Sequence, residues 1–478
     1  MAVVAAAVPF LLWAYEYGPD PGYCGVPGEG ASCAAGGTCH IGTANDKNNK
    51  GSISVAFPSG LNYIPGVKQH LTVTIADPAT TQQTWGFQLT ARTSSPTTMA
   101  GSFAYTDSNT ALICAKPGQP NQPFEALCLG GVRDSCTTSP AVPSCPTGFT
   151  LQYIEHSLTG YTKTQGTGSA SYSFDWTPPA TNAGNVVVYV AGNAGLGGNP
   201  TNMGSHIYTT TYTLAPQSFG GVPSISANGV ISAGAFGGYT NVAPGSWMEI
   251  YGANLAATTR GWAGADFTGT KAPTLLDGVK VTIGGQPAFI DFVSPGQVNA
   301  QVPSNVPAGA QTMTVTTPAG TSSTYPITVN ALQPGMLAPP QFAVNNKQYV
   351  AALFPDSTAN GPFVLPPTAI PGVPARYAKP GDTIIIYGVG FGPVKDSGGQ
   401  DIPAGTIVTA ANTLANPLTI TIGGQAATLG YQGLAPNFVG LYQFNVVVPN
   451  IANNDLAPLT YTLNGTAGPQ TLYVAVHN

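Results

Sequence analysis

The sequence predicts an all-β protein made of three consecutive β-sandwiches, and three observations lead to this prediction. Turn-forming residues are abundant, with 60 glycines and 44 prolines among 478 residues, and they separate short runs in which apolar and polar residues alternate. Charged residues make up only 7% of the chain, far below the roughly 25% of ordinary globular domains. The second half contains an internal repeat. Short strands joined by turns fit this composition, whereas long amphipathic helices do not.

Alternating runs define the first sandwich, which we expect at residues 51–216. Each run is bounded by Pro, Gly, Asn or Asp, as is typical of strands that end in turns. Their number and spacing indicate a β-sandwich. The expected strands are residues 52–57, 69–76, 85–91, 172–176, 185–191 and 207–214.

The repeat relates two segments with the same turn chemistry. Each copy has a Pro-Gly turn before an apolar strand, then a Gly-Gly turn, then a strand that ends in Val-Pro. Pro-Gly and Gly-Gly pairs are typical of tight turns, and self-similarity of this kind predicts two copies of one structural unit. The matching pairs are residues 243–252 with 379–388, 281–286 with 420–425, and 298–303 with 444–449.

We therefore expect two small immunoglobulin-like β-sandwiches, at residues 241–331 and 376–478. Residues 217–240 are rich in Gly and Ser and are expected to connect the first sandwich to this pair. The Pro-rich residues 332–375 are expected to connect the two copies.

The first 14 residues are expected to be a signal peptide. Residues 2–14 form an apolar run that is too short to span a bilayer and is followed by polar, Pro-rich sequence. No later run reaches the ~18 apolar residues of a membrane span. We expect a secreted protein, extracellular or at the cell surface, with no membrane span and with residues 15–50 as a Cys-rich N-terminal segment.

All seven cysteines precede residue 146, and they form two groups. Cys114, Cys128, Cys136 and Cys145 lie in a stretch rich in Pro, Gly and Ser, which we interpret as a surface insertion at residues 114–148. In an oxidising compartment these four most simply form two disulfide bonds. Three pairings are possible, and the sequence does not rank them.

The other group contains the one motif that suggests a cofactor. Cys33, Cys39 and His40 follow the order used for covalent haem attachment, in which two thioether bonds hold the porphyrin and the adjacent imidazole is an axial iron ligand. The gap between these cysteines is five residues, whereas two are usual. A Cys33–Cys39 disulfide with a neighbouring histidine is the alternative. Cys24 is left over under both interpretations.

Two resemblances to known families support this organisation. The Pro-Gly strand, the Ile-Gly-Gly-Gln hairpin and the strand ending in Val-Pro resemble IPT/TIG-type immunoglobulin-like domains. The arrangement of residues 222–478 is similar to a paired C-terminal module of many secreted bacterial proteins, which implies a fold and no chemistry. The first half resembles the reelin-like "choice-of-anchor" domain of secreted bacterial proteins. The matching segments are residues 25–30, 33–40, 85–89, 155–157, 174–179 and 189–194.

The second resemblance bears on the cofactor, because relatives tend to carry the short gap before Cys-His. It implies haem c on Cys33 and Cys39 with His40 on the iron, although this chain has three inserted residues there. His156 is the best candidate for a second axial ligand, since it lies at a matching family position in a strand-like run. His206 and Met203 are weaker candidates, and an ordinary hydrogen-bonded histidine is the alternative for each histidine.

The motifs of common enzymes are missing from the sequence. It contains no Gly-x-Ser-x-Gly elbow, no His-Glu-x-x-His helix and no phosphate-binding loop with Lys, so we expect no catalytic residues. A net charge of −5 provides no basic face for nucleic acid. Trp247, Trp262 and Tyr251 are aromatic residues that could stack on sugars, although most aromatic residues of sandwiches fill the core.

Three hypotheses for function remain. The first is a non-catalytic extracellular structural or adhesion protein that associates with itself or with extracellular matrix or polysaccharide. Its low charge permits self-association, and the uncharged residues 470–476 predict an exposed edge strand that could pair with another copy. The second is a monohaem electron-transfer protein, and the third is a carbohydrate-binding protein.

Overall fold

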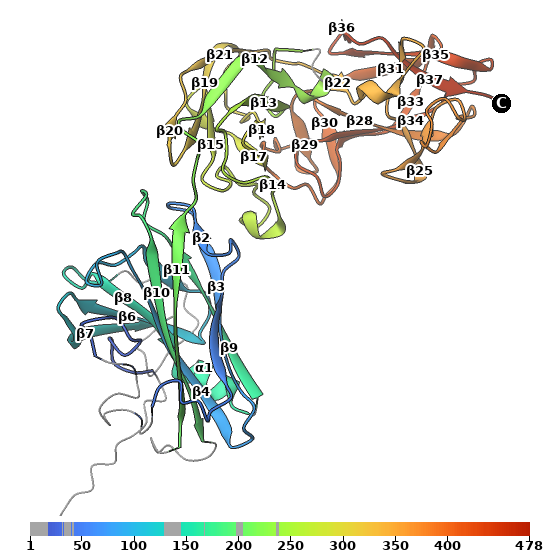
Figure 1. Ribbon diagram of the computed structural model, residues 1–478. Helices are drawn as coiled ribbons and strands as arrows, with labels where there is room; N and C mark the ends of the chain where they lie inside the picture. Colours follow the sequence, from blue (N-terminus) through green and yellow to red (C-terminus); the bar gives the residue numbers. More distant parts are fainter. Residues whose placement is uncertain are drawn as a thin grey trace, which may run out of the picture. The chain divides into compact units, whose positions relative to one another are not determined.

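A computed structural model describes residues 18–30, 32, 40, 43–128, 145–166, 168–196, 204–235 and 239–478, with the backbone alone for residues 120–128. The chain divides into two compact units, Met1–Gln217 and Ser218–Asn478 (Figure 1). The all-β prediction is confirmed, because strands make up nearly all regular structure of the described residues. No helix among these residues has the length and apolar character needed to cross a membrane.

The first unit is a β-sandwich of a four-stranded and a seven-stranded sheet. The four-stranded sheet has the order β1 (Ser52–Ala56), β3 (Gln69–Asp77), β9 (Gly168–Thr177), β5 (Ser102–Tyr105). The seven-stranded sheet has the order β2 (Asn62–Tyr63), β11 (His206–Pro216), β10 (Val186–Leu196), β4 (Gln82–Arg92), β8 (Leu151–His156), β6 (Thr110–Lys116), β7 (Gln119–Cys128). Alternate residues of both sheets, such as Ile75 and Leu89, fill one core. The short helix α1 (Leu158–Thr164) begins after Ser157, whose hydroxyl accepts from the Gly160 amide.

The predicted insertion at residues 114–148 begins inside this sheet, which corrects our interpretation. Cys114 lies in β6 and is fully buried. Residues of β6 face two cores, with Leu112 in the main core and Ile113 packed in a second cluster that contains Cys24. Burial on both faces removes the apolar-polar alternation, which is why the sequence did not predict a strand there.

One disulfide bond joins Cys114 to Cys145, with the Cα atoms 5.6 Å apart. It is one of the bonds allowed by the pairings that the sequence left open. The side chain of Cys128 and all of Cys136 lie outside the described residues.

The second unit begins with a sandwich of two five-stranded sheets, which we call repeat 1. One sheet has the order β12 (Ser224–Ser232), β13 (Trp247–Ala253), β18 (Gln297–Gln301), β17 (Phe289–Val293), β14 (Arg260–Gly261). The other has the order β16 (Gln286–Pro287), β15 (Lys280–Ile283), β19 (Gly309–Thr317), β20 (Gly320–Thr321), with β21 (Tyr325–Val329) also paired to β19. Two 3₁₀ turns, η2 (Ala233–Ala235) and η3 (Gly264–Asp266), flank the first sheet.

The following sandwich, repeat 2, contains seven-stranded and five-stranded sheets. The larger has the order β27 (Ala375–Arg376), β26 (Gly361–Val364), β25 (Leu353–Thr358), β28 (Thr383–Val389), β34 (Tyr442–Val447), β33 (Thr428–Leu434), with β22 (Gly335–Met336) paired to β28. The smaller has the order β32 (Gln425–Ala426), β31 (Leu418–Ile422), β35 (Asn454–Leu463), β36 (Thr466–Ala467), with β37 (Leu472–Val476) paired to β35. Short pairs and a 3₁₀ turn complete it: β23 (Ala343–Val344) with β24 (Lys347–Gln348), β29 (Val394–Asp396) with β30 (Asn412–Leu414), and η4 (Pro340–Phe342).

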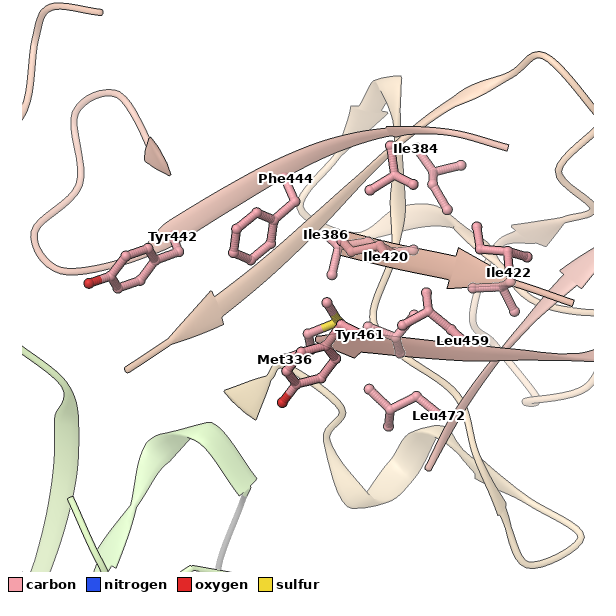
Figure 2. Close-up of a cluster of buried hydrophobic side chains, with 14 of the residues drawn as sticks. Met336, Ile384, Ile386, Ile420, Ile422, Tyr442, Phe444, Leu459, Tyr461 and Leu472 are labelled. Carbon is pink, nitrogen blue, oxygen red and sulfur yellow. The ribbon is translucent and has the colours of Figure 1, made fainter. Parts of the chain in front are cut away.

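Figure 2 shows the core of repeat 2, where side chains from both sheets meet. Ile384 and Ile386 come from β28, and Ile420 and Ile422 come from β31; all four are completely buried. This is the core that two facing sheets with period-two alternation produce.

The two repeats share one strand order. The path β13, β18, β17 corresponds to β28, β34, β33, and the path β16, β15, β19, β20 with β21 corresponds to β32, β31, β35, β36 with β37. The Gly-Gly turns correspond as well, because Gly284 (φ 54°) and Gly423 (φ 58°) both adopt left-handed conformations. The internal repeat of the sequence is therefore also a repeat of topology.

The two segments expected to be connections belong to the sheets, which is a further correction. Residues 217–240 contain β12, which pairs with β13. Residues 332–375 contain β22 to β26 and the first residue of β27, and of these strands β22 and β25 pair with β28. Their Gly and Pro content hid them, since strands tolerate Pro at sheet edges and at irregularities such as the register shift between Leu353 and Thr358.

The C-terminal edge strand is covered, contrary to our expectation of an exposed edge. Beyond its pairing with β35, β37 accepts hydrogen bonds at Tyr473 O from the Val350 amide (3.2 Å) and at Ala475 O from the Ala378 amide (3.0 Å). The edge that was expected to recruit a second copy is thus occupied by the same chain.

Candidate functional site

A pocket of about 640 Å³ lies in the second unit, on the outer face of the sheet that contains β13, β17 and β18. Repeat 1 provides this face, and loops of repeat 2 provide the opposite wall. Such a volume is typical of ligand sites. Its aromatic and polar side chains include Trp247, Glu249, Trp262, Phe267, Asp291, Asn299, Asn437 and Phe438.

Strand β13 presents two of these side chains because its residues alternate between the two faces of the sheet. Met248 and Ile250 are completely buried, in the core of repeat 1. Trp247 and Glu249 therefore point to the outer face, where they are half-buried.

A β-bulge in β17 accounts for the position of Asp291. The pairing of β17 with β18 shifts register between Ile290 and Phe292, so that Asp291 is the extra residue. Bulges redirect side chains and are frequent beside functional sites. The carbonyl oxygen of Asp291 accepts from the Trp262 amide (2.8 Å), which ties this bulge to the aromatic wall of the pocket.

The Asp291 carboxylate is partly satisfied. Gln297 Nε2 donates to Asn299 Oδ1 (2.8 Å), and the Asn299 side chain is hydrogen-bonded to Asp291. One of its carboxylate oxygens, Oδ1, is buried and has no hydrogen-bond partner among the described residues. Burial raises the pKa of Asp291 to about 6; the charge of Glu249 acts in the same direction, and the Asn299 hydrogen bond opposes the shift.

The aromatic wall consists of rings in edge-to-face contact. The centroids of Trp247 and Trp262 are 5.6 Å apart, and those of Trp262 and Phe267 are 4.8 Å apart. Arg260 anchors the loop that carries the last two rings. Its guanidinium donates to both oxygens of Asp266 (2.8 and 3.0 Å) and to Asp277 (2.7 Å). Bidentate pairs of this kind hold a loop in one conformation.

Repeat 2 closes the pocket through direct hydrogen bonds with repeat 1. Trp247 Nε1 donates to Val439 O (2.9 Å), and the Gly405 amide donates to the buried Gln301 Oε1 (2.7 Å). A Cβ at Gly440 would lie 1.9 Å from Gln301 Nε2, so only glycine permits this approach. Two more backbone hydrogen bonds, of 2.8 and 2.9 Å, join residues 270–272 to residues 405–407.

Two aromatic residues at this face differ from what the sequence suggested. Phe438, on the loop from repeat 2, is 54% exposed and lines the pocket. Tyr251 does not line it; its hydroxyl donates to Glu249 Oε2 (2.5 Å), and this hydrogen bond, with burial, raises the pKa of Tyr251 to about 12. Trp247 and Trp262, both proposed from the sequence, do line it.

The predicted haem motif lies mostly outside the described residues, which include His40 and exclude Cys33 and Cys39. The Nδ1 atom of His40 is buried and has no hydrogen-bond partner in the described part of the chain. Burial lowers the pKa of His40 to about 4, so its imidazole is neutral at pH 7. A neutral imidazole with an unsatisfied ring nitrogen fits a metal ligand.

His156, the predicted second ligand, lies in the core beside α1. Its side chain is 5% exposed, and its Nδ1 atom accepts from the Phe87 amide (3.1 Å). Its ring centroid lies 6.2 Å from that of Tyr172 and 6.5 Å from that of Tyr161. These contacts are those of a histidine packed in the sandwich.

The weaker candidates are placed as follows. His206 Nδ1 lies 2.6 Å from the buried Asp77 carboxylate, which also accepts from the Tyr208 hydroxyl (2.5 Å). Met203 is outside the described residues. Within the described ranges, no three His, Cys, Asp or Glu side chains come together as a metal-binding group.

Sequence reasoning missed Glu249, Asp291, Phe267 and Phe438. Glu249 could have been found by comparing the two copies of the repeat. The corresponding position in residues 379–388 is the apolar Ile385, so the charge is specific to the first copy. The bulge that directs Asp291 into the pocket and the loop that carries Phe438 leave no comparable mark in the sequence.

No protein-family model matches the chain, and no curated protein matches it. Solved structures do resemble it. The human F-spondin reeler domain (fragment 1) is 16% identical, covers 35% of this chain and 89% of its own, and has a TM-score of 0.20. The S-layer protein SbsC, domains 5–6, is 14% identical, covers 54% of this chain and 99% of its own, and has a TM-score of 0.21.

A third structure is the Bacteroides ovatus protein SGBP-B, from a mixed-linkage glucan utilization locus, in complex with a mixed-linkage heptasaccharide. It is 11% identical, covers 63% of this chain and 56% of its own, and has a TM-score of 0.24. At these identities and TM-scores the similarities identify neither a family nor a function.

Proposed function

We propose that the protein is a non-catalytic extracellular adhesion protein that binds polysaccharide through the pocket between repeats 1 and 2. The observation that carries the proposal is the aromatic wall of Trp247, Trp262 and Phe267 beside the carboxylates of Glu249 and Asp291. Apolar faces of sugar rings pack on aromatic rings, and a few polar groups then fix their orientation.

An extracellular location is supported by the covalent chemistry of the first unit. The Cys114–Cys145 disulfide bond is of the kind that persists in oxidising environments outside the cytosol. The low charge of the chain, 7% of residues, leaves a surface of hydroxyl, amide and backbone groups that can lie against neutral polymers.

The test is glycan binding by the full chain, measured by affinity electrophoresis and calorimetry with a panel of soluble polysaccharides. We expect binding that Trp262→Ala weakens at least tenfold, whereas Leu456→Ala, at a partly exposed apolar residue of repeat 2, leaves it unchanged. Equal binding by both variants would refute the proposal. Release of new reducing ends that Asp291→Asn abolishes would contradict its non-catalytic part.

A second candidate function is covalent attachment of haem c, with thioether bonds to Cys33 and Cys39 and His40 as an iron ligand. The neutral, unsatisfied imidazole of His40 supports it. A bound haem would supply one-electron transfer.

Expression with a cytochrome c maturation system tests this second candidate. We expect a Soret band and a mass increase of one haem that survives denaturation, both lost in Cys39→Ser. An unmodified mass with a mapped Cys33–Cys39 disulfide would show that the disulfide interpretation holds.

A further inference from the structure

The charges that line the pocket are all negative. Glu249 and Asp291 are its charged lining residues, and none of the described residues that line it is Lys, Arg or His. Arg260, which lies in β14 two residues before Trp262, is engaged by Asp266 and Asp277. A ligand that carries a carboxylate, sulfate or phosphate would therefore meet two uncompensated negative charges.

The two carboxylates are also not equally satisfied. Glu249 accepts a hydrogen bond from the Tyr251 hydroxyl, whereas Asp291 leaves Oδ1 buried without a partner among the described residues. Leaving a buried carboxylate oxygen without a donor costs free energy. A ligand that brings a donor to this atom removes that cost, and a cationic donor also compensates the charge.

The aromatic wall favours the same kind of group. Trp262 lies in edge-to-face contact with both Trp247 and Phe267, in the same pocket lining as these carboxylates. The faces of indole and phenyl rings attract cations. The volume of about 640 Å³ exceeds the needs of a small ammonium ion and suits a ring that carries one. The side-chain amides of Asn299 and Asn437 also line the pocket and can hydrogen-bond to hydroxyl groups.

We infer that the pocket binds an amino sugar, a pyranose with a free protonated amine, as a unit of an extracellular polysaccharide. This inference rests on the proposed function and makes it specific. The amine lies against the Asp291 carboxylate and the sugar ring lies against the aromatic wall. An N-acetylated sugar lacks the charge, and a uronic acid has the opposite charge.

Calorimetry with the full chain at pH 6.5 tests the inference, using four tetrasaccharides: β-1,4-linked glucosamine, its fully N-acetylated form, β-1,4-linked glucose and α-1,4-linked galacturonate. We expect the glucosamine tetramer to bind at least tenfold more tightly than the acetylated and glucose tetramers, and the galacturonate tetramer to bind least. Asp291→Asn should reduce this preference to about threefold or less while glucose binding is retained. Asp356→Asn, at a carboxylate that is 69% exposed in repeat 2, is the matched control.

The outcomes separate the inference from the proposed function. Glucosamine and glucose tetramers that bind equally, through a site that Trp262→Ala destroys, would overturn the inference and leave the proposed function intact. A glucosamine preference that survives in Asp291→Asn would also overturn it, because attraction to the net charge of the chain would then suffice. If no tetramer and no polysaccharide binds, the proposed function fails as well.

Discussion

The two repeats of the second unit have the same strand order but different outer faces. In both, the first strand of the shared path, β13 or β28, buries alternate residues in the core. The last strand of that path, β17 or β33, carries a bulge. Repeat 1 has aromatic and acidic residues at outward positions where repeat 2 has small or aliphatic ones. The corresponding pairs, from register and bulge, are Trp247 and Thr383, Glu249 and Ile385, and Asp291 and Gly430.

One feature of this face is common to both repeats. Gln297 Nε2 donates to Asn299 Oδ1, and Gln443 Nε2 donates to Asn445 Oδ1, each at 2.8 Å. The scaffold therefore keeps the same polar pair in both copies, but only repeat 1 places a carboxylate beside it. Binding chemistry in this protein is determined by outward positions that the fold does not constrain.

Replacing Gly440 with alanine should have the largest effect, because it disrupts the contact by which repeat 2 closes the pocket of repeat 1. Gln301 is held by hydrogen bonds at both ends of its amide, so it cannot yield to the new Cβ, and Gly440 has φ 64°. We expect the free energy of unfolding to fall by about 2–5 kcal/mol, because the added Cβ both overpacks the contact and strains a left-handed backbone conformation. Guanidinium unfolding of the full chain measures it.

Gly424→Ala is the matched control for this prediction. Gly424 has φ 78°, and no atom of the described residues lies within 4 Å of the position that a Cβ would take there, so only the backbone strain of about 1–2 kcal/mol applies. Equal losses in the two variants would mean that the contact between the repeats is not tight.

The second prediction concerns Asp291, a carboxylate of repeat 1 whose counterpart in repeat 2 is Gly430. Its folded pKa of about 6 exceeds the usual value of 3.8, so the folded protein binds this proton more tightly than the unfolded chain. The contribution of Asp291 to stability is therefore greatest below pH 4 and is lost as the pH rises through about 6. Asp291→Asn should raise the free energy of unfolding by about 2–3 kcal/mol at pH 7.5 and by little at pH 4.

Chemical unfolding at the two pH values checks this prediction. A gain of the same size at pH 4 would show that the carboxylate charge is not its cause. Asp382→Asn, at a half-buried carboxylate that accepts from the Lys379 amide in repeat 2, provides a control in which no such gain is expected.

The third prediction concerns the loop of repeat 1 that carries Trp262 and Phe267. Arg260→Gln removes the charge that links this loop to Asp277, so the rings lose their fixed orientation. Glycan binding should weaken about tenfold, the scale of one charge-assisted contact. Arg376→Gln, at an exposed ion pair of repeat 2, should leave the dissociation constant unchanged; a similar weakening there would attribute the effect to net charge.

The smallest effect is expected from the polar pair that both repeats share. Gln297→Leu frees the Asn299 amide that faces Asp291, and glycan binding should weaken about threefold, the scale of one neutral hydrogen bond. Gln443→Leu makes the same change in repeat 2, where there is no carboxylate beside the pair. Titration calorimetry compares them, and equal effects would place part of the binding site on repeat 2.

Strand positions could be predicted where one face of a strand is buried and the other is wet. Residues 69–76 and 172–176 follow this pattern, and both lie within strands. Thr110–Lys116 is buried on both faces, so its residues do not alternate. Ser224–Ser232 was missed because its glycine and serine content is that of a loop. Local patterns thus located the strands whose burial is one-sided.

The candidate site was predicted only in part, because the burial of its side chains depends on residues that are distant in the sequence. Trp247 and Trp262 could be named because tryptophans are few in this chain, 5 among 478 residues. Asp291 could not be distinguished from other acidic residues, because its burial comes from a bulge and from Asn299 on a neighbouring strand. His40 could be named from its neighbours Cys33 and Cys39, but its neutral state depends on burial.

The all-β class and the internal repeat follow from residues close together in the chain, because alternation and Pro-Gly or Gly-Gly turns are local properties. The pocket, the unsatisfied Asp291 carboxylate and the covered edge of β37 do not. Each of these depends on residues far apart in the sequence, such as Trp247 with Val439, or Tyr473 with Val350. Desolvation and edge pairing are properties of the packed chain, so only the tertiary structure could determine which side chains are free to bind a ligand.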